Sequence, residues 1–182
     1  MMKQPVVGAG PSGYVTVDFF TGDYRISAQI SVRNRTVNDI LNDKRVSYIE
    51  VFDAYVSRIS QPGYIVGSHH VALLRKDSIS LAVVPMEESR PSGQRAYRYG
   101  GKWLYQVFCT LPAFEVQGKV RTTGKLDLYS FLVTNVDDFV VLTEPLARVA
   151  NFPDNTFSGE SFLVNRLLIS MFCANEQPEL AE

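Results

Sequence analysis

The chain has 182 residues, which is enough for one ordinary domain or two very small ones. Hydrophobic residues make up 46% of the chain and charged residues 20%, a balance that is typical of folded globular proteins and excludes a largely disordered one. Because 18 lysines and arginines nearly balance 19 aspartates and glutamates, the overall charge does not indicate a nucleic-acid or membrane partner.

Residues 1–13 are expected to form a flexible leader. Gly8, Gly10 and Gly13 match the G-x-G-x-x-G pattern of flavin and nicotinamide proteins, whose glycines let the backbone approach a pyrophosphate. That pattern needs a buried strand before it and a helix after it. Here only residues 5–7 precede the motif, and residues 14–20 are rich in β-branched and aromatic side chains, which favours a strand. We therefore expect no cofactor at this motif.

A first small β repeat is predicted over residues 14–84. Apolar residues alternate along its strands, which indicates one buried face, whereas Val37, Ile40 and Leu41 have the spacing of a short helix. The predicted elements are strands at 15–20, 24–30 and 48–54, a helix at 35–42, a loop at 57–68, and paired apolar strands at 71–74 and 79–84 around a basic corner.

A polar linker at 85–101 separates this unit from a second repeat at 102–174, and residues 175–182 are expected to be a frayed tail. Equivalent positions in the two repeats lie about 90 residues apart. The predicted elements of the second repeat are strands at 104–111, 114–120 and 139–145, a helix at 125–133, a loop around 153–155, and paired apolar strands at 162–164 and 168–172.

The fold class predicted from this pattern is mainly β, with about five strands and one short helix in each repeat. A lone sheet of five short strands would leave open edges and an uncovered apolar face. Closing each repeat into a small barrel solves this problem, and so does packing the two repeats into a shared sandwich. Units of this size are marginal alone, so we expect burial between the repeats or between subunits.

Several segments match a known pattern, in which R-L-S-D-x-L-N, F-I-x-L-T-D-A and V-N-K-x-x-I follow a first apolar strand. The matching residues are Arg35–Asn42, Tyr48–Ala54 and Leu74–Ile79 in the first repeat, and Phe139–Pro145 and Val164–Ile169 in the second. The chain thereby resembles a tandem duplication of an uncharacterised family of bacterial domains with an Sm-like small β-barrel fold. The resemblance implies two such barrels and no established activity. Sm-like proteins in general form rings, and many bind RNA.

The residues do not form a convincing catalytic or metal-binding set. His69 and His70 are adjacent in a predicted strand, so they point to opposite faces and cannot chelate one metal together. The pair Asp137-Asp138 is explained better as a turn or cap than as a general acid and base. We expect a protein that is not an enzyme and has no catalytic residues, metal or cofactor. The opposing hypothesis is an enzyme that uses His69 or His70.

The N-terminus carries no signal-peptide pattern, and no apolar run approaches the roughly 20 residues of a membrane-spanning helix. Two cysteines, Cys109 and Cys173, are too few for a disulfide framework. The strands that hold them are expected to be neighbours, and buried structural thiols are favoured over a redox pair. These features predict a cytoplasmic protein with no membrane partner.

Charge separates along the chain, with a balance of +2 over residues 1–84, +1 over 85–101 and −4 over 102–182. Six basic residues of the first repeat lie in predicted turns or at helix ends and are candidate interaction residues. They are Arg33, Arg35, Lys44, Arg45, Arg75 and Lys76. The simplest interpretation is a solvated surface. A contact with the acidic half of a neighbouring subunit comes second, and a phosphate backbone third.

The favoured hypothesis is a non-catalytic Sm-like assembly protein that associates with itself as a homo-oligomer or scaffolds a protein partner. Stacking of the second repeat on the first repeat of another copy would be heterologous and would give a ring or a filament. The alternative is a module that binds RNA or single-stranded nucleic acid through the basic turns of the first repeat.

Overall fold

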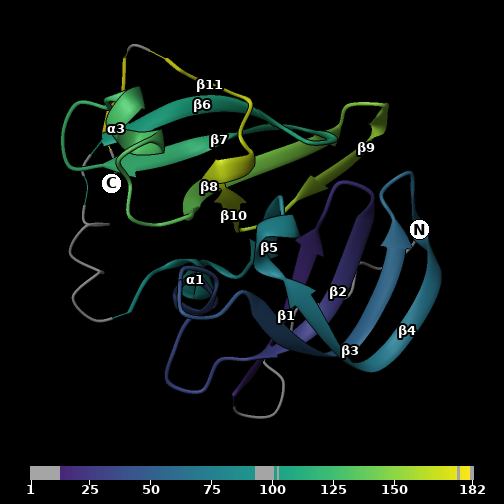
Figure 1. The fold of residues 1–182 in the computed structure, drawn as a ribbon. Helices are drawn as coiled ribbons and strands as arrows, with labels where there is room; N and C mark the ends of the chain where they lie inside the picture. Colours follow the sequence, from purple (N-terminus) through teal and green to yellow (C-terminus); the bar gives the residue numbers. More distant parts are fainter. Residues whose placement is uncertain (1–12, 93–100, 102, 176, 181–182) are drawn as a thin grey trace.

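The structure, a computed structural model, describes residues 13–92, 101, 103–175 and 177–180. Twelve antiparallel strands and three short helices make up this part of the chain, which confirms the mainly β class. The strand pairing runs as one open sheet through both halves, where the sequence analysis expected two barrels (Figure 1). The predicted leader, except Gly13, lies outside the described residues, as does much of the predicted linker.

The first half forms the purple-to-teal part of Figure 1. Its elements are β1 (Tyr14–Phe20), β2 (Tyr24–Ser31), α1 (Val37–Leu41), β3 (Tyr48–Arg58), β4 (Gln61–Arg75), the 3-10 turn η1 (Lys76–Ser78), β5 (Leu81–Val84) and α2 (Met86–Ser89). These strands pair in the order β5-β1-β2-β3-β4. Helix α2 falls inside the segment predicted as linker, where buried Ser89 accepts a hydrogen bond through its carbonyl from Asn38 Nδ2 at 2.8 Å.

The second half forms the green-to-yellow part, on the other side of β5 (Figure 1). Its elements are β6 (Trp103–Leu111), β7 (Phe114–Thr122), α3 (Leu128–Leu132), β8 (Phe139–Val149), β9 (Phe152–Ser158), β10 (Ser161–Asn165), the 3-10 turn η3 (Arg166–Leu168), β11 (Met171–Ala174) and β12 (Glu179–Leu180). The pairing order is β11-β6-β7-β8-β10, with β9 on β8 and β12 on β6. None of the helices in the described part of the chain has the length and apolar character needed to cross a membrane.

Local sequence explains most of these elements. Along β2, Ile26, Ala28 and Ile30 are buried while the residues between them are partly exposed, as the two-residue period predicts. Helix α1 begins at a capping box, in which the Thr36 hydroxyl accepts from the Asp39 N–H and the Asp39 carboxylate accepts from the Thr36 N–H. This cap fixes where the chain leaves β2 and enters the helix.

The loops predicted at 57–68 and 153–155 are wrong, because most of these residues extend β3 and β4 or form β9. Each segment contains a proline, Pro62 or Pro153, and this composition favoured a turn. Among the described residues, β4 and β9 each pair on one side only, with β3 and β8 respectively. Both prolines fall at register shifts of these edge strands, where the regular pairing is interrupted and the N–H that proline lacks is not needed.

Two buried clusters form the core, and they meet between β5 and β10. The cluster of the first half is built from β1, β2, α1 and β3, yet it includes Phe139 and Leu163 from the second half. The cluster of the second half in turn includes Phe20 and Leu81 from the first half. Each half therefore completes its core with side chains from the other, so the two halves stabilise each other.

Candidate interaction surface

The joint between the two halves is an antiparallel pairing of β5 with β10, which we call the inner joint. Its register places Ser161 opposite Val84 and Leu163 opposite Ala82. All five residues of β10 are buried. Asn165 fixes the end of the pairing, because its N–H donates to the carbonyl of Ser80 at 2.9 Å and its Nδ2 to the carbonyl of Ile79 at 3.0 Å. The inner joint is thus a buried antiparallel strand pairing whose end is fixed by hydrogen bonds.

Two leucines cross the inner joint into the opposite core. Leu163 of β10 is 0% exposed and packs in the cluster of the first half, whereas Leu81 of β5 is 0% exposed and packs in the cluster of the second half. Gly159 lies just before β10, where a Cβ would stand 2.4 Å from Val83 Cγ1. A larger residue at position 159 would push β5 and β10 apart, so close approach explains this glycine.

The sheet ends in two open edges, β4 at one end and β11 at the other (Figure 1). Within the described residues, β4 pairs with β3 alone and β11 with β6 alone. Both edges expose large apolar side chains: Leu73 on β4 is 69% exposed, Val71 beside it is also exposed, and Met171 on β11 is 48% exposed. Unpaired backbone groups next to apolar side chains favour pairing with another strand, so these edges are the candidate interaction surface.

The structure places three of the six predicted basic residues in ion pairs at the end of α1. Arg35 and Arg45 both contact the Asp43 carboxylate, at 3.0 and 2.8 Å, and Lys44 contacts Asp138 at 3.3 Å. Hydrogen bonds from the Arg45 side chain and backbone hold the pKa of Asp43 well below its usual range. These three cations are therefore partly neutralised within the chain.

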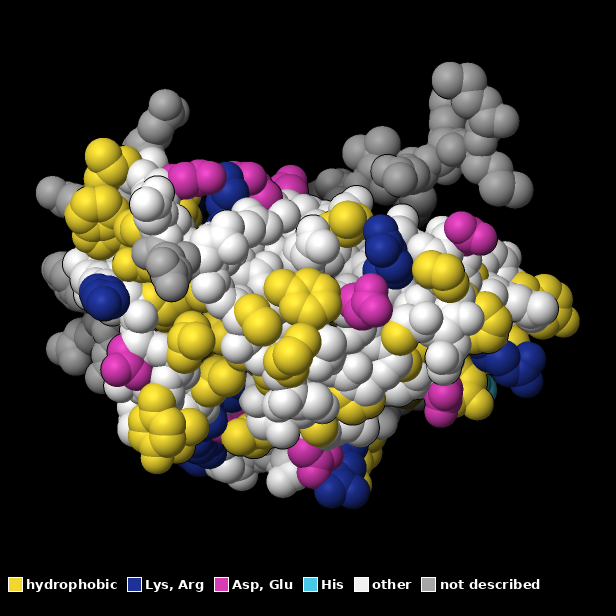
Figure 2. Space-filling model, turned by 90° about the horizontal axis from the view of Figure 1, so that it is seen from above, with side chains coloured by type: hydrophobic (Ala, Val, Ile, Leu, Met, Phe, Trp, Pro, Cys, Tyr) yellow, Lys and Arg dark blue, Asp and Glu magenta, His cyan; other side chains and the backbone are white. Residues whose placement is uncertain are grey.

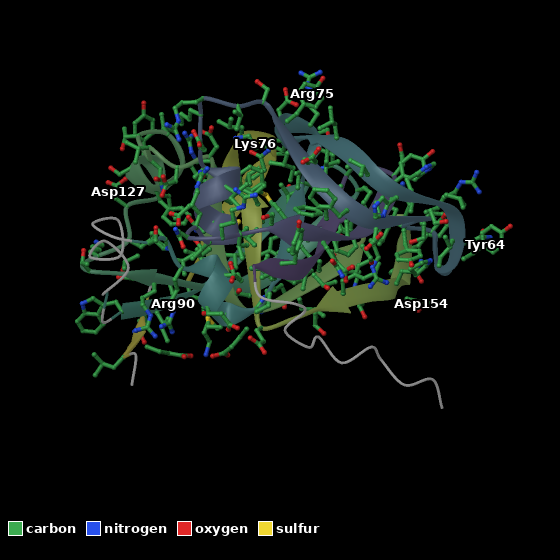
Figure 3. The ribbon with its side chains drawn as sticks, turned by 90° about the horizontal axis from the view of Figure 1, so that it is seen from below. Tyr64, Arg75, Lys76, Arg90, Asp127 and Asp154 are labelled. Carbon is green, nitrogen blue, oxygen red and sulfur yellow. The ribbon has the colours of Figure 1, made fainter. Side chains whose placement is uncertain are left out.

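The other three basic residues do not form one basic patch with these three. Arg75 points outward and pairs with Asp77, whereas Lys76 points into the body of the protein (Figure 3). Lys76 is buried, its Nζ donates to the carbonyl of Asp43, and burial lowers its pKa. Arg33 is exposed and forms no hydrogen bond or ion pair with the residues that the structure describes. From above, lysines and arginines lie scattered among acidic and hydrophobic side chains (Figure 2).

The remaining candidate groups have structural partners or exposed positions. His69 and His70 lie in β4 as predicted, both exposed, and His70 Nδ1 is 2.8 Å from Asp53 Oδ1. Asp138 accepts from Arg166, which also donates to the backbone carbonyls of Leu132, at the end of α3, and of Asn135 and Asp137 in the following loop. In the described part of the chain, no three His, Cys, Asp or Glu side chains come together as metal ligands.

The two thiols lie on neighbouring strands but are not equivalent. Cys109 of β6 is buried and stands opposite Phe172, whereas Cys173 of β11 stands opposite Phe108 and is exposed. Burial raises the pKa of Cys109 to about 12, with a smaller contribution from Cys173. The thiolate of Cys109 is therefore almost absent at neutral pH.

We expect one thiol per chain to react rapidly with Ellman's reagent at pH 8 in dilute native protein, and both to react in denaturant, because only Cys173 is exposed. The variant Cys173→Ser should lose the rapid phase, which assigns it. Rapid reaction of two thiols in the native wild type would contradict the burial of Cys109.

Comparison of the chain with protein-family models, curated proteins and solved structures found no significant match.

The sequence by itself does not single out the exposed edge residues. Leu73 and Met171 lie in segments that it assigned to strands or their ends, where an apolar residue is read as core. One signal was available: residues 71–74 and 171–174 contain no charged side chain, although edge strands usually carry one.

Proposed function

We propose that this protein is a non-catalytic assembly protein whose copies join head to tail, with β4 of one copy pairing with β11 of the next. The observation that carries the proposal is a contrast in burial. Strands β5 and β10 bury nearly all of their side chains beside the inner joint, while β4 and β11, in corresponding places of the two halves, leave theirs exposed or only partly buried. Head-to-tail pairing would cover both edges at once.

The correspondence rests on a duplication, which is part of the proposal. In each half the second strand pairs with the first and third, and the last strand returns to the first. Asp53 in β3 and Glu144 in β8 have matching positive φ values of 48° and 49° beside register shifts in the pairing with β2 and β7. The turns η1 and η3 both begin at a basic residue. The duplicated unit is, in this proposal, the small Sm-like barrel that the sequence resembles.

The inner joint supplies the register of the proposed contact. The facing pairs of β10 and β5 are Ser161 with Val84, Phe162 with Val83, Leu163 with Ala82, and Val164 with Leu81. In the proposed duplication β4 corresponds to β10 and β11 corresponds to β5. The same register between β4 and β11 therefore places Ala72 opposite Cys173 and Leu73 opposite Phe172 of the next copy. We call this pairing the outer joint.

Side chains on the two edges fit this register. Leu73 takes the place of Leu163, so it would enter the core of the neighbouring copy beside Phe172, which already packs against that core. Met171 takes the place of Leu81 and would pack next to Leu74, which lies against the core of the first half. Leu73 and Met171 are the most exposed large apolar residues of β4 and β11 respectively, and their counterparts Leu163 and Leu81 are completely buried at the inner joint. Removing this apolar area from water favours association.

A heterologous contact of this kind repeats along one direction and produces a closed ring or a filament. The contact is apolar, which differs from the electrostatic stacking considered from the sequence. The cations considered there already have partners in their own chain, apart from Arg33. A self-assembling protein in which apolar strands carry the contact is the function that these observations support best.

The register is tested by cross-linking. Facing residues in antiparallel strands have Cα atoms about 4.5–5.5 Å apart, which a disulfide can bridge. Under mild oxidation with diamide, Ala72→Cys should form a ladder of covalent oligomers through the native Cys173 of the next copy. The matched control is Ser68→Cys, on the same strand and four residues out of register. Light scattering over a concentration series of the wild type should show defined multimers, and a monomer at every concentration would overturn the proposal.

A further inference from the structure

Helix α3 differs from α1 in how much of it is covered. Val37 and Leu41 of α1 are buried, whereas no residue of α3 is buried. Leu128 and Tyr129 of α3 are exposed, as are Val133 at its C-cap and Val136 beyond it. We call these four residues the α3 face.

A contact between the two halves, separate from the β5–β10 pairing, shows what covers the corresponding end of α1. Asn42 follows α1 and holds both backbone groups of Phe139, the first residue of β8: its Oδ1 accepts from the N–H at 2.8 Å and its Nδ2 donates to the carbonyl at 3.1 Å. Phe139 is buried in the same cluster as Leu41. One half therefore places the start of its third strand against the helix end of the other half.

We propose that the α3 face is the second part of the outer joint and binds the start of β3, at Tyr48, of the next copy. The inference rests on the proposed head-to-tail assembly. Val133 follows α3 as Asn42 follows α1, and Tyr48 begins β3 as Phe139 begins β8. Val133 is 55% exposed and Tyr48 is 53% exposed, so each leaves uncovered the area that the other would bury.

The chemistry of this contact differs from that of its counterpart within one chain. Within one chain, the Asn42 amide holds Phe139 by hydrogen bonds. In the proposed contact between copies, the aliphatic Val133 stands in the place of Asn42 and faces Tyr48. The ion pair Lys44–Asp138, at 3.3 Å between the two halves of one chain, corresponds in the proposed contact to the uncharged pair Asn135 and Ser47. The occupant of the α3 face is therefore an apolar, uncharged segment, which the first half of a second copy supplies. Because no charge pair is involved, salt should hardly alter the association.

A double-mutant cycle tests the contact. Val133→Lys and Tyr48→Glu should each raise the dissociation constant of the assembly at least about tenfold, because each exposes a charge to an apolar partner. Combined in one chain, they should recover much of the lost affinity, since the introduced charges face each other between copies. The control Leu146→Lys, at an exposed aliphatic position on β8, should change the constant less than about twofold.

The outcomes separate this inference from the proposed function. Sedimentation velocity gives the dissociation constant, and thermal unfolding of the dilute variants verifies that the exposed substitutions leave the fold intact. If the two single variants assemble like the wild type, or if their effects simply add, the α3 face is not part of the joint while strand pairing stands. If wild-type protein does not assemble at all, both the inference and the proposed function fall.

Discussion

Leu73→Lys is expected to convert assembled protein into monomers. In the proposed outer joint this side chain would enter the core of the neighbouring copy, as Leu163 enters the core of the first half at the inner joint. A lysine ammonium in that position would be buried without a partner, which costs several kcal/mol, on the order of a 100-fold or greater loss of affinity. Sedimentation velocity at a concentration where wild-type protein is assembled measures the change.

The matched control is Leu73→Met, which keeps an apolar side chain of similar volume and should assemble. Leu73 is 69% exposed in the single chain, so neither substitution should alter the unfolding of dilute protein. Assembly of Leu73→Lys at wild-type concentrations would place the contact elsewhere on the molecule.

Leu163→Ala is expected to have the largest effect on stability. Leu163 is fully buried in the inner joint, and truncation of a buried leucine typically lowers the free energy of unfolding by about 2–5 kcal/mol. The counterpart Leu73→Ala should change it by less than about 0.5 kcal/mol in dilute protein, because its side chain is in water. Urea denaturation of both variants measures the difference.

The pair of leucines isolates the effect of location, since the residue type and the substitution are the same and the two strands, β4 and β10, correspond in the proposed duplication. Equal losses in dilute protein would mean that Leu73 is already covered in the single chain. In that case β4 is not an open edge and the outer joint is excluded.

Open apolar edges are a hazard, because any strand of suitable shape can pair with them. In this protein the two edges lie at opposite ends of the sheet and, in the proposed register, complement each other (Figure 1). Pairing with a further copy would satisfy the edges in a defined way and limit nonspecific contacts. The same kind of strand pairing would then join the two halves within one chain, at the inner joint, and neighbouring copies, at the outer joint.

The basic residues show how local sequence can mislead about a surface. Six cations in turns were candidates for a contact, yet Asp43 alone binds two of them, and Lys76 is buried against the same segment. Turn positions predicted exposure, but they carry no information on which carboxylate folds back onto which cation. The binding of RNA through these turns stays a prediction. Most of the basic side chains would first have to break an ion pair or hydrogen bond within their own chain before they could contact a phosphate.

The sequence by itself determined the mainly β class and most strand positions, because the two-residue alternation of apolar side chains is a local property. Some of its failures were also local: prolines at 62 and 153 suggested loops where edge strands tolerate them. Residues 71–74 and 162–164 look alike as short apolar runs. Only the tertiary structure decided that β10 is covered by β5 while β4 is left open. The reason is physical: pairing between strands far apart in the chain depends on how both halves pack, which no local pattern records.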